Sequence, residues 1–390
     1  SSRNSCYTKR VMLRFIYATS FLFSFQSAIT AYLNSSFLSS YFSGNLIGVF
    51  FTASSIVSLL ILSFLPKILS KVGNRNFSTG LLTLGAFSAL LMSLGAHPLI
   101  TAVAFIASQI TLVVMVPSMD IFIEHYSKQE DTGKARGIYL TIINVAWVIS
   151  PFLATRLFLF GGFSELYAIV AIVLALSSLV LYHSSKGFAD KKYMREPFWI
   201  ALKKIRARPN LARISTVNFI LQFFYSWMVV YTPLYLTQTI GLGWDVIGII
   251  FTIMLLPFVL FQLPLGRLAD KRLGEKEILI TGIFIMGIST LVFAFSHSFI
   301  PLIIGAVLFA TRTGASFIEI MAETYFFKNV NEEDAEMISL FRDSMPIAYL
   351  IGPLLGGIVI GKLGYEPLYI ILSVVVFLAL IPAFKLKDTK

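Results

Sequence analysis

The sequence is short of cysteine and of charge. Cys6 is its single cysteine, so an intramolecular disulfide is excluded, and so is a metal or redox centre built from thiolates. Only 13% of the 390 residues are charged, whereas 57% are hydrophobic, and the mean hydropathy is +0.81. A water-soluble domain needs more charge than this to cover its core. The composition therefore indicates a chain that lies in lipid.

Histidine is also scarce, and its positions argue against catalysis. The four histidines, His97, His125, His183 and His297, all fall at the ends of hydrophobic stretches, and no metal-ligand spacing joins them. An intramembrane enzyme needs a nucleophile, a base or a metal set that converges on one point. We therefore predict that the protein is not an enzyme and has no metal or other cofactor.

Acidic residues are fewer than basic ones, 20 against 31, which gives a net charge of +11. The basic residues gather in alternate connections between hydrophobic stretches, for example in 67–75 and 186–213. Because such positive connections stay on the cytoplasmic side, both termini are expected in the cytoplasm. The protein itself is expected in a bacterial inner (plasma) membrane. This distribution explains the charge without nucleic acid as a partner.

Long apolar stretches recur from end to end, and each is long enough to cross a hydrocarbon layer of roughly 30 Å as a helix. The first six are 11–33, 45–65, 77–94, 99–123, 137–160 and 166–182. The second six are 217–236, 246–265, 278–295, 302–327, 337–360 and 368–384. We predict an all-α polytopic membrane protein with twelve transmembrane helices, and a monomer.

The two sets of six repeat each other at a shift of about 200 residues, as repeated transporter halves do. Residues 47–52 read IGVFFT and residues 247–252 read IGIIFT. Asp120, Glu124 and Tyr126 correspond to Glu319, Glu323 and Tyr325 in the same way. The repeat predicts two pseudo-symmetric six-helix bundles, residues 1–184 and 214–390. Between them, residues 185–213 form a cytoplasmic linker, whose segment 197–206 is expected to lie as an amphipathic helix against membrane lipid.

A loop motif follows the eighth stretch, where residues 266–276 read GRLADKRLGEK. This segment closely matches the cytoplasmic loop motif of the major facilitator superfamily, which the chain resembles over its whole length. The equivalent first-half loop, residues 66–75, keeps the basic positions and one glycine but has Ser70 in place of the acid. The resemblance implies a secondary active transporter that moves a small-molecule substrate by alternating access.

The same loops are expected to carry a cytoplasmic gate. Glycine near a helix end permits close helix approach, and a carboxylate can sit against the positive N-terminus of a helix. By resemblance, Asp270 would lie near Arg136, and Glu323 would pair with Lys271 or Arg272. A static anchor for the loop is the alternative. The full set of expected gate residues is Gly266, Asp270, Lys271, Arg272, Arg136, Glu323, Asp120, Glu124 and Lys71.

Charged residues inside the apolar stretches are candidates for function because they are costly in lipid. Arg312 lies near the expected bilayer midplane, where a guanidinium would clamp a carboxylate, phosphate or sulfonate of a substrate. A fixed ion pair with Glu319 or Asp343 is the alternative. Together with Arg342 these residues are expected to form one network, in which Glu319 or Asp343 carries a coupling proton. A permanently satisfied cluster of charges is the alternative.

Neutral polar and aromatic residues near the middle of the stretches extend this list. They are candidates for a mixed substrate pocket, with helix packing or interfacial anchoring as the alternative for each. The set comprises Gln26, Gln109, Asn144, Trp147, Gln222, Tyr225, Trp227 and Tyr231.

Two features of the sequence favour different substrates. Arg312 favours a small organic anion, whereas the broad aromatic and aliphatic content favours a multidrug or sugar exporter that works as a proton antiporter. The exporters of the resembled superfamily carry a glycine-rich proline motif in the fifth helix, where this chain reads Ser150-Pro151-Phe152. No acid occurs in the first stretch, so a coupling proton would be carried by the second half; facilitated diffusion or another coupling ion is also open.

Overall fold

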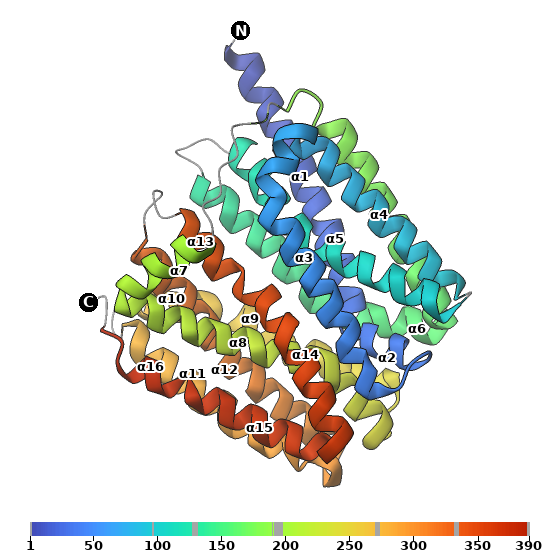
Figure 1. Cartoon of the computed structure of the whole chain (residues 1–390), viewed down its shortest axis with the longest axis vertical. Coiled ribbons are helices and arrows are strands. Elements are labelled where there is room, and N and C mark those ends of the chain that lie inside the picture. Colours follow the sequence, from blue (N-terminus) through green and yellow to red (C-terminus); the bar gives the residue numbers. More distant parts are fainter. Residues whose placement is uncertain are drawn as a thin grey trace. The chain divides into compact units, whose positions relative to one another are not determined.

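A computed structural model describes residues 2–95, 97–126, 132–188, 190, 198–269, 274–330 and 335–387. All regular structure in these ranges is helical, and none of the residues in them forms a strand (Figure 1). The prediction of an all-α polytopic membrane protein is confirmed.

Ten stretches of the described residues are long and apolar enough to cross a membrane. One of them, Ile142–Ser184, has 43 residues and would extend about 65 Å at 1.5 Å per residue, which is enough for two crossings. It lies in α6 (Thr132–Ser184), which is interrupted at Gly162 by a non-helical backbone with φ 75° and ψ −156°. A left-handed φ of this kind favours glycine, so the fifth and sixth predicted spans are joined through this residue.

The chain divides into two compact units. The first comprises Ser1–Tyr41 and Ala53–Met194, and the second comprises Phe42–Thr52 and Arg195–Lys390. The start of α3 (Gly44–Val72) therefore belongs with the second unit, where the Thr52 hydroxyl donates a hydrogen bond of 2.9 Å to the Leu350 carbonyl.

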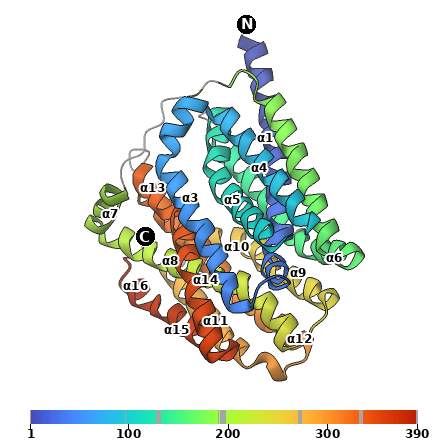
Figure 2. The same ribbon diagram turned by 45° about the vertical axis from the view of Figure 1, so that its right-hand side comes forward.

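The first unit is built from long helices that pack side by side. Helix α1 (Ser2–Ala31) packs against α6, and α4 (Asn74–Leu94) packs against both α6 and α5 (Pro98–Tyr126). Both views show α4 beside α6 (Figures 1 and 2). The short α2 (Asn34–Ser39) follows α1 directly and is buried along most of its length.

The second unit contains the remaining helices. Its helices are α7 (Phe198–Ala207), α8 (Pro209–Leu234), α9 (Trp244–Leu260), α10 (Gln262–Leu268), α11 (Glu275–Ala294), α12 (Pro301–Lys328), α13 (Ala335–Arg342), α14 (Ser344–Leu363), α15 (Tyr365–Leu378) and α16 (Leu380–Phe384). Helix α12 packs against α11, α9 and α8, while α14 packs against α8. These contacts place α8 and α12 side by side in the interior of the unit.

The expected amphipathic helix of the linker corresponds to α7. Its Ala201 and Ile205 are buried, and the helix packs on α13 and α8. Lys203, Lys204 and Arg206 are exposed. Their solvated side chains lie on the part of α7 that does not pack on the unit.

The internal repeat is visible in backbone geometry as well as in sequence. Gly73 before α4 has φ 80° and ψ 148°, and Gly274 before α11 has φ 80° and ψ 175°. The residue that follows each glycine, Asn74 or Glu275, is fully buried. Because side chains rarely tolerate a φ of 80°, both halves keep glycine at this helix entry.

Candidate functional site

Arg312 is the central residue of the candidate site. It lies near the middle of α12, and only 1% of its surface is exposed. Its guanidinium carbon is 5.3 Å from the ring centre of Phe224 and 5.4 Å from that of Tyr225, both on α8. Cation–π contacts of this length contribute about 0.5 to 2 kcal/mol but supply no hydrogen-bond acceptor.

Two nitrogens of this buried guanidinium are open. Neither Nε nor Nη1 of Arg312 has a hydrogen-bond partner among the described residues. These two nitrogens therefore do not make the ion pair with Glu319 or Asp343 that was the alternative interpretation. Leaving a buried charged donor unpaired is expensive, so the site is suited to an acceptor that is not part of the chain.

Glu319 lies on the same helix, seven residues and roughly 10 Å further along. Its Oε2 accepts a hydrogen bond of 2.7 Å from the Tyr225 hydroxyl. Tyr225 thus contacts both ionisable residues, the guanidinium through its ring and the carboxylate through its hydroxyl. Tyr225 was already a candidate as an aromatic residue near mid-span, but nothing in its sequence position placed it between Arg312 and Glu319.

Glu323, one further turn along α12, has a partner that was not expected for it. It forms an ion pair with Arg342 of α13, in which Oε1 and Nη1 are 2.6 Å apart. The Arg342 side chain is half exposed. Lys271 and Arg272, the expected partners of Glu323, lie outside the described residues.

The described residues show part of the expected four-residue network. Glu319 interacts electrostatically with Arg312, Arg342 and Glu323, but it is hydrogen-bonded to Tyr225, while Arg342 is paired with Glu323. Asp343 is buried at the start of α14. Among the described residues, Arg312, Tyr225 and Glu319 come together in the interior.

Trp227 and Tyr231 serve helix packing in this structure. The Trp227 Nε1 donates a hydrogen bond of 2.5 Å to the Gly352 carbonyl, and the Tyr231 hydroxyl donates one to the Pro353 carbonyl. Both side chains are almost fully buried, and Tyr231 lies so close to Gly356 that a Cβ there would be 2.3 Å from its ring. Their role as substrate contacts stays a prediction.

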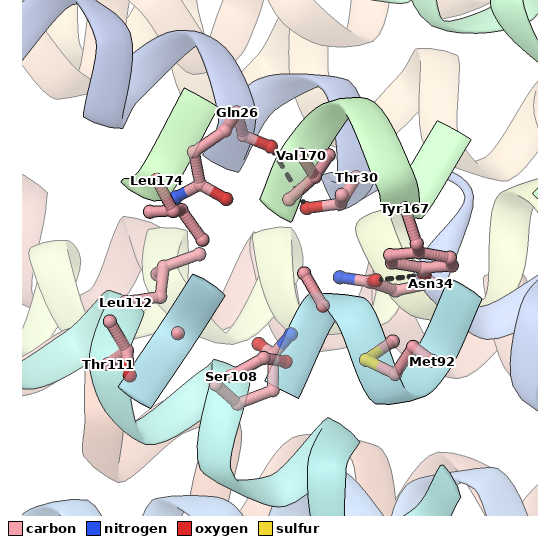
Figure 3. A pocket seen from close by; sticks show the side chains of 13 residues that line it. Gln26, Thr30, Asn34, Met92, Ser108, Thr111, Leu112, Tyr167, Val170 and Leu174 are labelled. Carbon is pink, nitrogen blue, oxygen red and sulfur yellow. Dashed lines mark hydrogen bonds between the residues drawn. The ribbon is translucent and has the colours of Figure 1, made fainter. Parts of the chain in front are cut away.

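Gln26 and Gln109 lie on a cavity within the first unit (Figure 3). The cavity has a volume of about 20 Å³ and is enclosed by α1, α2, α4, α5 and α6. The other three candidates, Asn144 and Trp147 on α6 and Gln222 on α8, are half-buried.

The comparison with protein families decides the class. The model of the Major Facilitator Superfamily matches residues 16–247 and again residues 214–390. The chain belongs to this superfamily. It is therefore a transporter and not an enzyme, and it is an integral membrane protein.

Relatives and solved structures agree with this assignment. An uncharacterized transporter of the superfamily from Methanocaldococcus jannaschii is 28% identical over 155 residues, and the chain spans 39% of that relative's length. A bacterial homologue of the human lysosomal transporter Spinster has a TM-score of 0.74 at 14% identity, and the alignment covers 97% of this chain and 96% of that one. The nucleoside transporter NupG has a TM-score of 0.73 at 14% identity, covering 97% of this chain and all of that one. These similarities show the shared fold.

The gate expected for this superfamily member is only partly within the described residues. Asp270, Lys271 and Arg272 lie outside them, as do the side chains of Arg136 and Glu124. Lys71 is exposed at the end of α3 and Asp120 is half-buried on α5. A Cβ built at Gly266 would meet no atom within 4 Å, so no described residue makes the close approach that its glycine suggested.

Two acidic residues at the loop ends were missed by sequence analysis. Asp190 accepts a hydrogen bond of 2.8 Å from the Asn74 N–H at the start of α4, and thus supplies an acid close to the loop in which Ser70 replaces one. The buried Glu275 forms a 2.7 Å ion pair with Lys328. The sequence separation of each pair is large, and nothing in the local pattern of residues indicates either contact.

Proposed function

We propose that this superfamily member transports a small organic anion by alternating access and binds it through Arg312. One observation supports the proposal above all: the guanidinium is buried and two of its nitrogens are open. A carboxylate, phosphate or sulfonate offers two oxygens that match the fork of a guanidinium. The bound anion would supply the acceptors that the chain does not.

The surroundings of Arg312 favour an anion with an apolar body. Phe224 is fully buried beside the guanidinium, and Tyr225, the next residue of α8, also presents its ring to the guanidinium. Aromatic rings stabilise the cation and exclude water, but they leave the hydrogen-bonding edge for an anionic group. Aromatic carboxylates and sulfonates therefore form the first class to test.

Charge balance supports proton coupling. If Glu319 is ionised, it already offsets the charge of Arg312 through the space between them, and an added anion leaves the low-dielectric interior with an uncompensated negative charge. A proton on Glu319 removes this excess. We therefore infer that one proton accompanies each monovalent anion, which makes the carrier a symporter and not the proton antiporter of the alternative.

Transport by reconstituted protein tests the anion site. The parent, Arg312→Gln and Arg312→Lys are compared in proteoliposomes for binding and uptake of radiolabelled benzoate and benzenesulfonate. Two charge-assisted hydrogen bonds of about 1.5 to 3 kcal/mol each predict that Arg312→Gln weakens binding by roughly a hundredfold or more. Arg312→Lys is expected to be intermediate, because lysine keeps the charge but loses the fork.

Arg156→Gln is the matched control. Arg156 is also an arginine within a hydrophobic helix, but it is exposed and its guanidinium lies over the Phe152 ring. It is expected to bind the anions as the parent does. Equal movement of lipophilic cations by the parent and Arg312→Gln, with no anion binding by either, would replace the carrier interpretation with the exporter.

Orientation is inferred from the charge distribution. The basic connections support cytoplasmic termini and a location in a bacterial inner membrane, and the exposed basic residues of α7 support contact with anionic membrane lipid. Protease protection of terminal tags in inside-out vesicles tests the first point.

A further inference from the structure

The cavity within the first unit has both polar and apolar walls. Its walls include Gln26 and Thr30 of α1, Asn34 of α2, Thr111 of α5 and Tyr167 of α6 (Figure 3). Gln26 and Asn34 are only 7% and 4% exposed, so their side chains are more than nine-tenths buried. Of the residues that the structure describes, no aspartate, glutamate, lysine or arginine lines the cavity.

The hydroxyl hydrogens around this cavity are already used. Thr30 donates to the Gln26 carbonyl at 3.1 Å, Thr111 donates to the Ala107 carbonyl at 3.0 Å, and Tyr167 donates to the Asn34 Oδ1 at 2.8 Å. Each hydroxyl oxygen therefore retains only its acceptor capacity toward the cavity.

The two buried amides add one acceptor and one donor. The Gln26 Nε2 donates to the Ser27 hydroxyl at 2.8 Å, which leaves Oε1 as an acceptor. The Asn34 Oδ1 is occupied by Tyr167, and Figure 3 shows the Asn34 nitrogen turned away from that bond toward the cavity. The walls thus offer both kinds of hydrogen-bonding group to one small guest.

We propose that this cavity is a binding site for a single buried water molecule held between Gln26 and Asn34. A water molecule donates two hydrogen bonds and accepts two, which matches the mixed walls, and a cavity of about 20 Å³ exceeds the roughly 10 to 15 Å³ that one water needs. Sodium is the other small guest with affinity for oxygen. Sodium is disfavoured because a cation binds oxygen atoms and is repelled by the Asn34 amide hydrogens. No carboxylate among the described residues lines the cavity to offset its charge.

The site gives Gln26 a role that the sequence did not suggest. Its amide connects α1 to the interior of its own bundle through water, so the residue serves the packing of polar helices in lipid. Such a water-mediated contact is nearly as favourable as a direct hydrogen bond, yet it can exchange partners when helices shift. The site is independent of Arg312 and of the proposed anion.

Radiolytic hydroxyl labelling in H₂¹⁸O tests the proposal, because X-rays generate hydroxyl radicals from buried water in place. Met92 and Tyr167 line the cavity and are each 2% exposed. Met321 and Tyr325 are 0% and 2% exposed and do not line it. In the purified transporter, Met92 and Tyr167 are expected to be labelled several times faster than Met321 and Tyr325.

Two variants localise the source of the labelling. Gln26→Leu removes the acceptor with little change of volume, and Ala89→Val fills the cavity from α4; either is expected to reduce the Met92 rate to that of Met321. Ala104→Val, at an alanine of α5 that is equally buried but does not line the cavity, serves as the control and leaves the rate unchanged.

Two results would overturn the water site. Equal labelling of Met92 and Met321 in the parent would mean that the cavity is dry. A rise in the thermal unfolding temperature with sodium but not with potassium or choline, absent in Gln26→Leu, would mean that a cation occupies it.

Discussion

The proposed proton–anion symport predicts that Glu319→Gln loses proton coupling but still exchanges anions. The Tyr225 hydroxyl donates to the Glu319 carboxylate at 2.7 Å, and the charged groups acting on it are Arg312 and Glu323 of α12 and Arg342 of α13. Glutamine keeps a hydrogen-bond acceptor for Tyr225, but it can neither gain nor lose a proton.

The size of the effect follows from thermodynamics. If one proton enters with each monovalent anion, one unit of pH difference is worth about 1.4 kcal/mol and sustains about a tenfold accumulation of the anion. The process moves no net charge, so this ratio should not depend on membrane potential. Glu319→Gln lowers the ratio to one, because only the concentration gradient of the anion then acts.

The assay uses proteoliposomes whose interior is one pH unit more alkaline than the medium, with potassium and valinomycin to clamp the potential. Benzenesulfonate is the solute of choice, since a strong acid stays ionised and does not cross the bilayer as a neutral molecule. Exchange of internal against external labelled sulfonate is measured in parallel.

The matched control is Glu323→Gln, which removes a carboxylate one turn away and breaks the ion pair with Arg342. Its rate is free to change, but an accumulation ratio is set by stoichiometry and should remain near tenfold. Accumulation by Glu319→Gln equal to that of the parent would refute the assignment of the proton to this residue.

Three further changes test the packing and the loop contacts. Gly356→Ala places a Cβ 2.3 Å from the Tyr231 ring and is expected to destabilise the protein by about 1 to 3 kcal/mol in a thermal-shift measurement. The control is Gly361→Ala, whose Cβ would have its nearest contact at 3.5 Å and which should unfold near the parent temperature. Asp190→Ala removes the side chain that caps α4 and should lower the free energy of unfolding by about 1 kcal/mol in the same measurement. Asp190→Asn keeps an acceptor oxygen and should keep most of the stability. Equal stabilities of the two variants would argue against capping. Glu275→Gln replaces the buried partner of Lys328, whose side chain is 40% exposed, so a loss of only about 1 kcal/mol is expected, and high salt should reduce the difference from the parent.

Hydropathy was sufficient to predict the helical membrane fold, because a segment in lipid must satisfy its backbone internally and therefore reads as a long apolar run. The same rule could not reveal that the fifth and sixth spans meet at Gly162, since a tight reversal and a short loop look alike in composition. Arg312 stood out as a charge within an apolar run. That two of its nitrogens would be open and that Glu319 would be bonded to Tyr225 depended on side-chain geometry between α8 and α12, which no single-helix pattern contains.

Contacts between distant residues account for most of the remaining differences. The family resemblance suggested Lys271 or Arg272 as the partner of Glu323, and that pairing stays a prediction because both lie outside the described residues. Within the described residues Glu323 pairs with Arg342, which follows it by 19 positions. Gln26 was a candidate substrate ligand because it is a polar residue near mid-span, and that role stays a prediction. The structure adds that Gln26 lines a small cavity inside its own bundle.

Among the described residues, every charged side chain that is buried belongs to the second unit: Glu275, Arg312 and Asp343. The described buried polar residues of the first unit are all uncharged, although the two halves repeat each other in sequence. A symmetric pair of identical subunits would have to place each of these charges twice, doubling the desolvation that lipid imposes. Joining the halves in one chain removes that constraint, because each half can then be substituted on its own and the charges need to be placed only once.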